Sequence, residues 1–431
     1  MAFSSENSIP VSPPRGCTAV ICVYYLVGIM FFILGLGTLL PWNFFMTASL
    51  YFQRRLNTTE WSNGTKVVRK EYYFNNWMTL LSQLPLLLFT LLNSFLYPRI
   101  SEAIRIAGSL VFILLLFILT AVLVKVPMEE DRFFSVTMAT IWFINSFGAV
   151  LQGSLFGLVG MLPQKYSSIF MSGQGLAGTF AAIAMLIAIG SKMDPETAAL
   201  GYFVTPCMGT LLTLFSYLVL PRLEFAQYYL NKSSTYEADT TDELLKGRLW
   251  LHKQLFTIPE LMPFIWVMAF CVMFVFTVTL SVFPAITVDV KTTSEGKNWE
   301  LYFISVCCFL IFNINDWLGR TITTKIRWPS KESRLFPVLV ISRVVFIPLL
   351  MFCNVQSRNY LPVLFEHDVA FSIIMVLFSL SSGYFVCLSM SYAPQLVEPK
   401  DAETAGALMT FFLALGLSIG AALSFPLRKL I

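Results

Sequence analysis

Long apolar runs alternate with short polar segments along the whole chain. An α-helix needs about twenty apolar residues to cross a bilayer. A backbone inside lipid must satisfy its hydrogen bonds within its own helix, so we expect an all-α polytopic membrane protein. The pattern predicts eleven transmembrane helices, over residues 19–48, 76–97, 104–125, 133–160, 167–190, 199–221, 259–288, 299–325, 335–355, 369–393 and 403–427.

The longest polar segment separates the sixth predicted helix from the seventh. It predicts an N-terminal six-helix half (1–222), a cytosolic linker (223–258) and a C-terminal five-helix half (259–431). An odd number of spans places the two termini on opposite sides of the membrane. Lys and Arg are shared almost equally between the loops of the two sides, so the positive-inside rule does not orient the chain.

The loop at residues 51–73 gives better evidence than the positive-inside rule for the orientation of the chain in the membrane. It contains two N-glycosylation sequons, at Asn57 and Asn63, and two sequons in one polar loop favour an exterior position. The N-terminus is then cytosolic and the C-terminus exterior. A third sequon, at Asn231, falls in the predicted cytosolic linker and is expected to stay unmodified.

The predicted helix at residues 299–325 carries polar groups where a membrane span normally has none. Phe309, Asn313, Asp316 and Arg320 are spaced by four, three and four residues, which places them in one stripe of an α-helix. A lone charge near a bilayer centre costs several kcal/mol, so this stripe is expected to face protein or water. It is either a functional site or an i,i+4 ion pair that locks helices together.

Other spans contain isolated polar or kinked positions. Gln152 is a single amide that can donate and accept at once, as recognition of a polar heterocycle requires. Trp42 follows a proline that bends the first span, and it suits either a binding wall or gate or an interfacial anchor. Phe283 and Pro284 form a second aromatic kink, and Arg343 is ascribed to an interhelical or snorkelling salt bridge.

Composition narrows the function further. Hydrophobic residues make up 56% of the chain and charged residues 13%, against about 25% charged in soluble domains. The eight cysteines show no CxxC spacing, both histidines lie outside the spans, and no nucleophile, nucleotide or metal motif is present. We therefore expect no enzyme, no metal and no cofactor. The net charge of +4 is spread over both signs, which predicts no nucleic-acid partner.

Several longer motifs resemble one family over nearly the whole chain. They are LGLGTLLPWNFFMTA, LPLLLFTLLNSF, GAVLQGSLFG, MSGQGLAG, FPAITV, FNINDWLGR and ETAGALMTFFLALGLSIGA. In these motifs the chain is similar to the vertebrate equilibrative nucleoside transporters, with features of both the type-1 and the type-2 branch. The resemblance implies eleven helices in a 6+5 arrangement related to the major facilitator fold, around a central cavity.

The resemblance also assigns roles to residues. It implies that Gln152 meets the nucleobase edge and that Asp316 with Arg320 meets the ribose hydroxyls. Met46, Phe283 and Pro284 are expected to form the outer gate. The remaining cavity wall is implied to include Leu39, Trp42, Met46, Leu86, Phe309, Asn313 and Leu417.

The expected function is facilitative, bidirectional transport of purine and pyrimidine nucleosides, such as adenosine and uridine, by alternating access. The expected location is the plasma membrane, where the multi-pass chain contacts the lipid bilayer. Transport of nucleobases and binding of nucleoside-like inhibitors stay open, as does the choice between type 1 and type 2. The alternative is a proton-coupled carrier of nucleosides or organic cations; a receptor or an intramembrane enzyme fits the residues less well.

Overall fold

The computed structural model describes residues 17–47, 52, 55–56, 59–62, 65–68, 74–96, 100–191, 195–223, 247–294, 297–355, 358 and 360–431. In the first part of the chain the helices are α1 (Cys17–Thr47), α3 (Phe74–Leu96), the π-helical turn η1 (Ile104–Gly108), α4 (Ser109–Lys125), α5 (Glu130–Gly160), α6 (Gln164–Ser191), α7 (Pro195–Val219) and η2 (Leu220–Arg222).

In the second part they are α9 (Gly247–Val282), η3 (Thr287–Asp289), α10 (Lys297–Phe303), the π-helix η4 (Ile304–Leu310), α11 (Ile311–Ile322), α12 (Leu335–Ser342), η5 (Arg343–Val345), α13 (Phe346–Met351), α14 (Asp368–Tyr392), η6 (Ala393–Gln395) and α15 (Ala402–Leu430). The helix α9 begins inside the segment predicted as a linker. The division into two halves and a linker stays a prediction.

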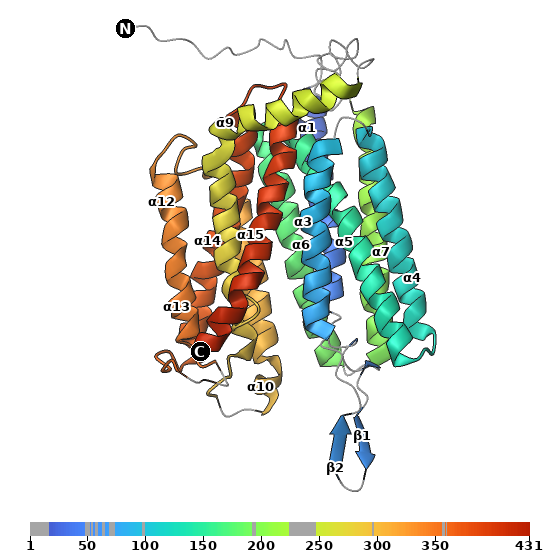
Figure 1. The fold of residues 1–431 in the computed structure, drawn as a ribbon, viewed down its shortest axis with the longest axis vertical. Coiled ribbons are helices and arrows are strands. Elements are labelled where there is room, and N and C mark those ends of the chain that lie inside the picture. The colour runs from blue at the N-terminus through green and yellow to red at the C-terminus, as the bar shows by residue number, and fades with distance from the viewer. Residues whose placement is uncertain are drawn as a thin grey trace.

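The helices stand side by side in one bundle (Figure 1). Among the first helices α1 packs on α6, α3 on α5, and α4 on α7. Among the later ones α9 packs on α15 and α14 on α11. The two groups meet where α11 packs on α6 and where α15 packs on α5 and α3. The boundary between the groups therefore runs between α6, α5 and α3 on one side and α11 and α15 on the other.

The outer surface of the bundle is apolar, as a lipid environment requires. On α3, Leu80, Leu84 and Leu88 follow one another at four-residue spacing and are each about half exposed. Within the described residues, eight helices are long and apolar enough to cross a membrane. Two shorter apolar helices cover residues 80–93 and 335–351. The chain is an all-helical membrane bundle, and the count of eleven spans stays a prediction.

One of the predicted spans is not a continuous α-helix. Residues 299–325 were expected to form a single helix, yet the structure divides this stretch into α10, the π-helix η4 and α11. A π-helix bonds each residue to the fifth along and forms a wider turn. Phe309 lies in η4, whereas Asn313, Asp316 and Arg320 lie in α11.

A small hairpin, which the sequence analysis did not predict, lies outside the all-helical bundle (Figure 1). Strands β1 (Thr59–Ser62) and β2 (Thr65–Val68) pair antiparallel, with Thr59 opposite Val68. The two residues between the strands are Asn-Gly, the pair that favours two-residue hairpin turns. The hairpin projects from the end of the bundle where α10 lies and α15 ends (Figure 1). The sequon residues Asn57 and Asn63 lie outside the described residues.

Candidate functional site at the boundary between the helix groups

The polar centre of the boundary is an ion pair within α11. Arg320 Nε lies 2.7 Å from Asp316 Oδ2, and the two residues are only 6% and 8% exposed. The i,i+4 spacing of a regular α-helix brings the two side chains together on one face. The predicted pairing of these residues is therefore present, and the pair is buried in protein.

The arginine reaches beyond its own helix. Arg320 Nη1 donates to Gln174 Oε1 on α6 over 3.5 Å, and Gln174 Nε2 donates to Thr38 Oγ1 on α1 over 2.9 Å. Gln174 and Thr38 are both buried. The ion pair is thus the end of a hydrogen-bonded chain that links α11 to α6 and α1. Nothing in the sequence pattern singled out Gln174 beyond its place in the glycine-rich MSGQGLAG motif.

Two glycines of α6 let α11 come this close. A Cβ atom on Gly175 would lie 2.9 Å from Trp317 Cα, closer than real side chains approach. A Cβ on Gly178 would collide with the Asn313 side chain and would lie 3.5 Å from Asn43 Oδ1. Small residues therefore permit the helix contact that the polar chain crosses.

Asn313 lies on the same side of the boundary as the ion pair. Its Nδ2 donates to Phe309 O over 2.8 Å, and its Oδ1 faces the Gly178 position. Asn43 of α1 faces the same glycine and donates to Leu39 O. The structure thus brings two amides to one point of the boundary. Asn43 was not among the predicted site residues, although its neighbour Trp42 was.

Further hydrogen bonds cross the boundary. Ser172 Oγ and Thr321 Oγ1 are 2.7 Å apart, and Trp317 Nε1 donates to the same serine over 3.2 Å. Arg327 Nη1 donates to Gln164 Oε1 over 3.0 Å. Each of these contacts joins α6 to the segment from α11 to residue 327. These hydrogen bonds run between the two helix groups, so they could break and re-form if the groups moved relative to each other.

Gln152 lies on α5 and is 6% exposed. It forms no hydrogen bond with a residue in the described part of the chain, and the structure does not bring it into bonding contact with Asp316 or Arg320. A buried amide without a partner is costly unless a ligand or water bonds to it. The side-chain amide of Gln152 therefore has no hydrogen-bond partner among the described residues, and its role in recognition stays a prediction.

The predicted gate residues fall in different hydrophobic clusters. Phe283 stacks on Phe312 with ring centroids 3.8 Å apart and meets the edge of Phe309 at 5.9 Å. Met46 packs with Trp42 and Leu417 against the main cluster instead. Pro284 and Leu86 are partly buried, as is Leu39, which packs against Leu40 and Phe44. The described contacts do not join the two sides of the predicted gate.

The described residues contain no group of three or more His, Cys, Asp or Glu side chains that could hold a metal ion. Their polar interior contains the Asp316–Arg320 ion pair, the buried guanidinium groups of Arg105 and Arg343, and several amides and hydroxyls.

Arg343 differs from its predicted role. It was ascribed to a salt bridge, yet it forms none with a residue of the described part of the chain. Its guanidinium is 2% exposed and donates only to neutral acceptors of α9 and α14. These acceptors are Ser381 Oγ at 3.0 Å, Val275 O at 3.1 Å, Thr279 Oγ1 at 3.2 Å and Phe378 O at 3.2 Å.

An all-helical membrane bundle with a polar site between two helix groups is the architecture of a membrane transporter. A solved structure of the fucose:proton symporter of E. coli superposes with a TM-score of 0.51 at 12% identity, over 95% of this chain and 91% of the symporter. A second structure of that symporter is described as a Major Facilitator Superfamily transporter in the outward conformation. The first likeness supports the fold class alone.

The chain belongs to the nucleoside transporter family, whose model matches residues 138–429. It is 54% identical to human equilibrative nucleoside transporter 2 and 48% identical to human equilibrative nucleoside transporter 1, over 95% of this chain and 98% of each relative. Rat equilibrative nucleoside transporter 3 is 33% identical over 91% of this chain. The family resemblance expected from the motifs is confirmed, and the relatives are transporters and not enzymes.

Proposed function

We propose that this protein carries purine and pyrimidine nucleosides across the plasma membrane in both directions, without coupling to an ion gradient. Two relatives named equilibrative nucleoside transporters share about half of their residues with it over almost the full length. The observation that carries the proposal is the buried Asp316–Arg320 pair at the boundary between two helix groups.

The Asp316–Arg320 pair has hydrogen-bonding atoms that no described residue occupies. Asp316 Oδ1 accepts no hydrogen bond from the described residues, and Arg320 uses only two of its three guanidinium nitrogens there. A ribose presents vicinal hydroxyls that donate to a carboxylate and accept from a guanidinium. The free oxygen and the free donors can therefore bind the two hydroxyls while the ion pair stays intact.

The nucleobase is proposed to bind away from the charges. Gln152 can donate and accept at its polar edge, since no described residue occupies that amide. The flat faces of a base suit apolar walls. The proposed wall consists of Leu39, Trp42, Met46, Leu86, Phe309, Asn313 and Leu417, with Phe283 and Pro284 joining Met46 as the outer gate.

Alternating access then follows from the boundary contacts. The hydrogen bonds between Ser172 and Thr321 and between Gln164 and Arg327 would open when the two groups rock apart. The proposal includes eleven spans in a 6+5 arrangement. Its N-terminus is cytosolic, and its C-terminus shares the exterior side with the hairpin, which is supported by their common end in Figure 1.

Uptake into proteoliposomes tests the function. Labelled uridine and adenosine should equilibrate across the membrane and never exceed the outside concentration, with or without imposed pH and sodium gradients. Accumulation driven by a pH gradient would instead establish the proton-coupled alternative, which no observation favours. Competition by uracil and by a nucleoside-like inhibitor in the same preparation decides whether nucleobases and inhibitors bind.

The topology has its own test. A glycosidase mobility shift should disappear in the variant Asn57→Gln/Asn63→Gln and persist in Asn231→Gln. The reverse pattern would place the hairpin loop in the cytosol and overturn the proposed orientation.

A further inference from the structure

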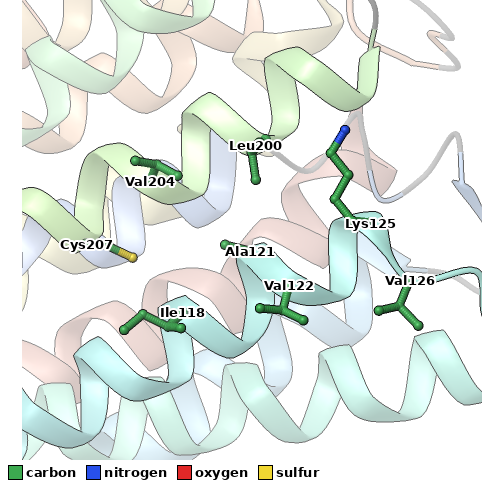
Figure 2. Close-up of a pocket in the computed structure, with 8 residues that line it drawn as sticks. All are labelled: Ile118, Ala121, Val122, Lys125, Val126, Leu200, Val204 and Cys207. Carbon is green, nitrogen blue, oxygen red and sulfur yellow. The ribbon is translucent and has the colours of Figure 1, made fainter.

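A groove lies on the lipid-facing side of the bundle, between α4 and α7 and away from the ion pair (Figure 2). It encloses about 470 Å³. Its walls are almost entirely apolar, and Ile118, Val122 and Val204 are each about half exposed. The lining residues are Ile118, Ala121, Val122, Lys125, Val126, Leu200, Val204 and Cys207.

One cation stands at an end of this groove. Lys125 is the last residue of α4, and Figure 2 shows its ammonium group extending away from the apolar part of the groove. Lys125 is exposed and pairs with no acid in the described part of the chain. An apolar channel that ends at an unpaired ammonium group matches an amphiphile with a hydrocarbon tail and an anionic head.

The surroundings of Lys125 strengthen its attraction for an anion. The last carbonyls of a helix form the negative end of its dipole and would repel an anion. Here Arg55 donates to the carbonyl oxygens of Leu123 and Val124 over 3.0 and 2.9 Å, so a second cation covers this end of α4. The nearby carboxylate of Glu129 lies 3.5 Å from Arg132 and is balanced by it.

We propose that this groove binds a phospholipid, with one acyl chain between α4 and α7 and the phosphate on Lys125. The eight residues from Ile118 to Lys125 span about 10 Å of helix. This length fits within one leaflet, about half of a hydrocarbon core roughly 30 Å thick. Lys125 at the interface end then meets the depth at which phosphates lie. A sterol offers a hydroxyl but no anion and leaves the ammonium unpaired.

Native mass spectrometry of the purified full-length protein tests the proposal by titration with phosphatidylglycerol. The wild type should hold one lipid more tightly than the rest. Lys125→Met removes the charge and should weaken that lipid about fivefold, the effect of one cation near an anionic surface. Val204→Trp fills the groove from its exposed side and should weaken the same lipid to a similar extent. Lys165→Met removes an exposed lysine outside the groove and should change nothing.

Equal affinity in all four proteins would show annular lipid only and overturn the site. A loss in Lys125→Met without a loss in Val204→Trp would reduce it to a surface ion contact, which also overturns the groove. Displacement of the tight lipid by cholesterol at equal concentration would overturn the choice of phospholipid. Uridine uptake should be unchanged in Lys125→Met, so this test is independent of the proposed transport function.

Discussion

Two buried arginines of the same membrane bundle have opposite environments. Arg320 pairs with an acid at 2.7 Å and reaches across the boundary to Gln174 on another helix group. Arg343 has no acid in contact and is surrounded by neutral acceptors of α9 and α14 within its own group. The first has donors left over, whereas the second has every guanidinium nitrogen bonded.

The difference in their hydrogen-bond partners indicates a different role for each arginine. A guanidinium whose nitrogens are all bonded inside one group holds helices together and cannot exchange partners. A guanidinium at a boundary, with one acid and one long hydrogen bond, can accept a ligand as an additional partner. Under the proposed function, Arg320 binds substrate and Arg343 holds helices together, and four experiments test this contrast.

The largest effect is expected at the ion pair. Asp316→Asn and Arg320→Gln should each lower uridine uptake per surface molecule by at least about a hundredfold, because breaking a buried pair costs about 3 kcal/mol or more. Removing one partner also leaves a buried charge, so surface expression should fall. The double variant Asp316→Asn/Arg320→Gln should recover expression but not uptake. Recovery of uptake would show that the pair only locks helices.

A different profile is expected for Arg343→Met. Loss of its hydrogen bonds should lower the free energy of unfolding by about 1–3 kcal/mol. The melting temperature and the surface expression should fall as a result. Uptake per surface molecule should stay near that of the wild type, since the hydrogen bonds of Arg343 all go to neutral acceptors of α9 and α14. Arg343→Lys serves as the charge-preserving control and should be intermediate in stability. An unchanged melting temperature together with lost uptake would contradict the contrast.

An intermediate effect is expected at Gln174. Gln174→Leu removes the bridge between Arg320 and Thr38 and leaves the ion pair in place. The Arg320–Gln174 hydrogen bond is long, at 3.5 Å, so we expect its loss to cost about 0.7–1.4 kcal/mol and to raise the KM for uridine about three- to tenfold. Thr38→Val cuts the chain one step further away and should have the smaller effect. If Thr38→Val exceeds Gln174→Leu, the chain does not act through the arginine.

The smallest effect is expected at the neutral contact across the boundary. Ser172→Ala and Thr321→Val should each change uptake by about fivefold or less, since a neutral hydrogen bond contributes about 1 kcal/mol. A double-mutant cycle on maximal uptake rates should give a coupling of that size. Fully additive effects would show that this contact does not stabilise the observed arrangement of the two groups.

The ion pair could be predicted because charges within apolar runs stand out and because i,i+4 spacing fixes their geometry within one helix. Gln174 could not, since its partners come from α11 and α1, and tertiary packing alone decides which of several amides they meet. The salt bridge expected for Arg343 was wrong for a related reason. Hydroxyl and carbonyl groups are very common along a sequence, so the sequence does not reveal which of them will accept hydrogen bonds from a buried cation.

The fold likewise has features that the sequence predicts and features that it does not reveal. The apolar runs predicted the helices, because each run must satisfy its own backbone in lipid. The hairpin at Thr59–Val68 was overlooked, although Asn-Gly between two short polar strands favours such a turn. The start of α9 at Gly247 was also missed, because the twelve residues before the predicted span at 259 mix apolar with charged and polar residues and form no continuous apolar run.

The π-helix from Ile304 to Leu310 affects how many residues fit between α10 and α11. It accommodates an extra residue ahead of the stripe, so deleting one residue here would leave a plain α-helix. Each residue of an α-helix turns the chain by about 100°, whereas a π turn holds more residues and turns the chain less at each one. A plain α-helix with one residue fewer would therefore cover nearly the same rotation, so Trp299 should stay within reach of the Asp368 carboxylate that it now meets at 3.0 Å, and Asp316 and Arg320 should keep their pairing. The π-helix thus holds one more residue while the two ends of the segment keep their orientation toward their neighbours.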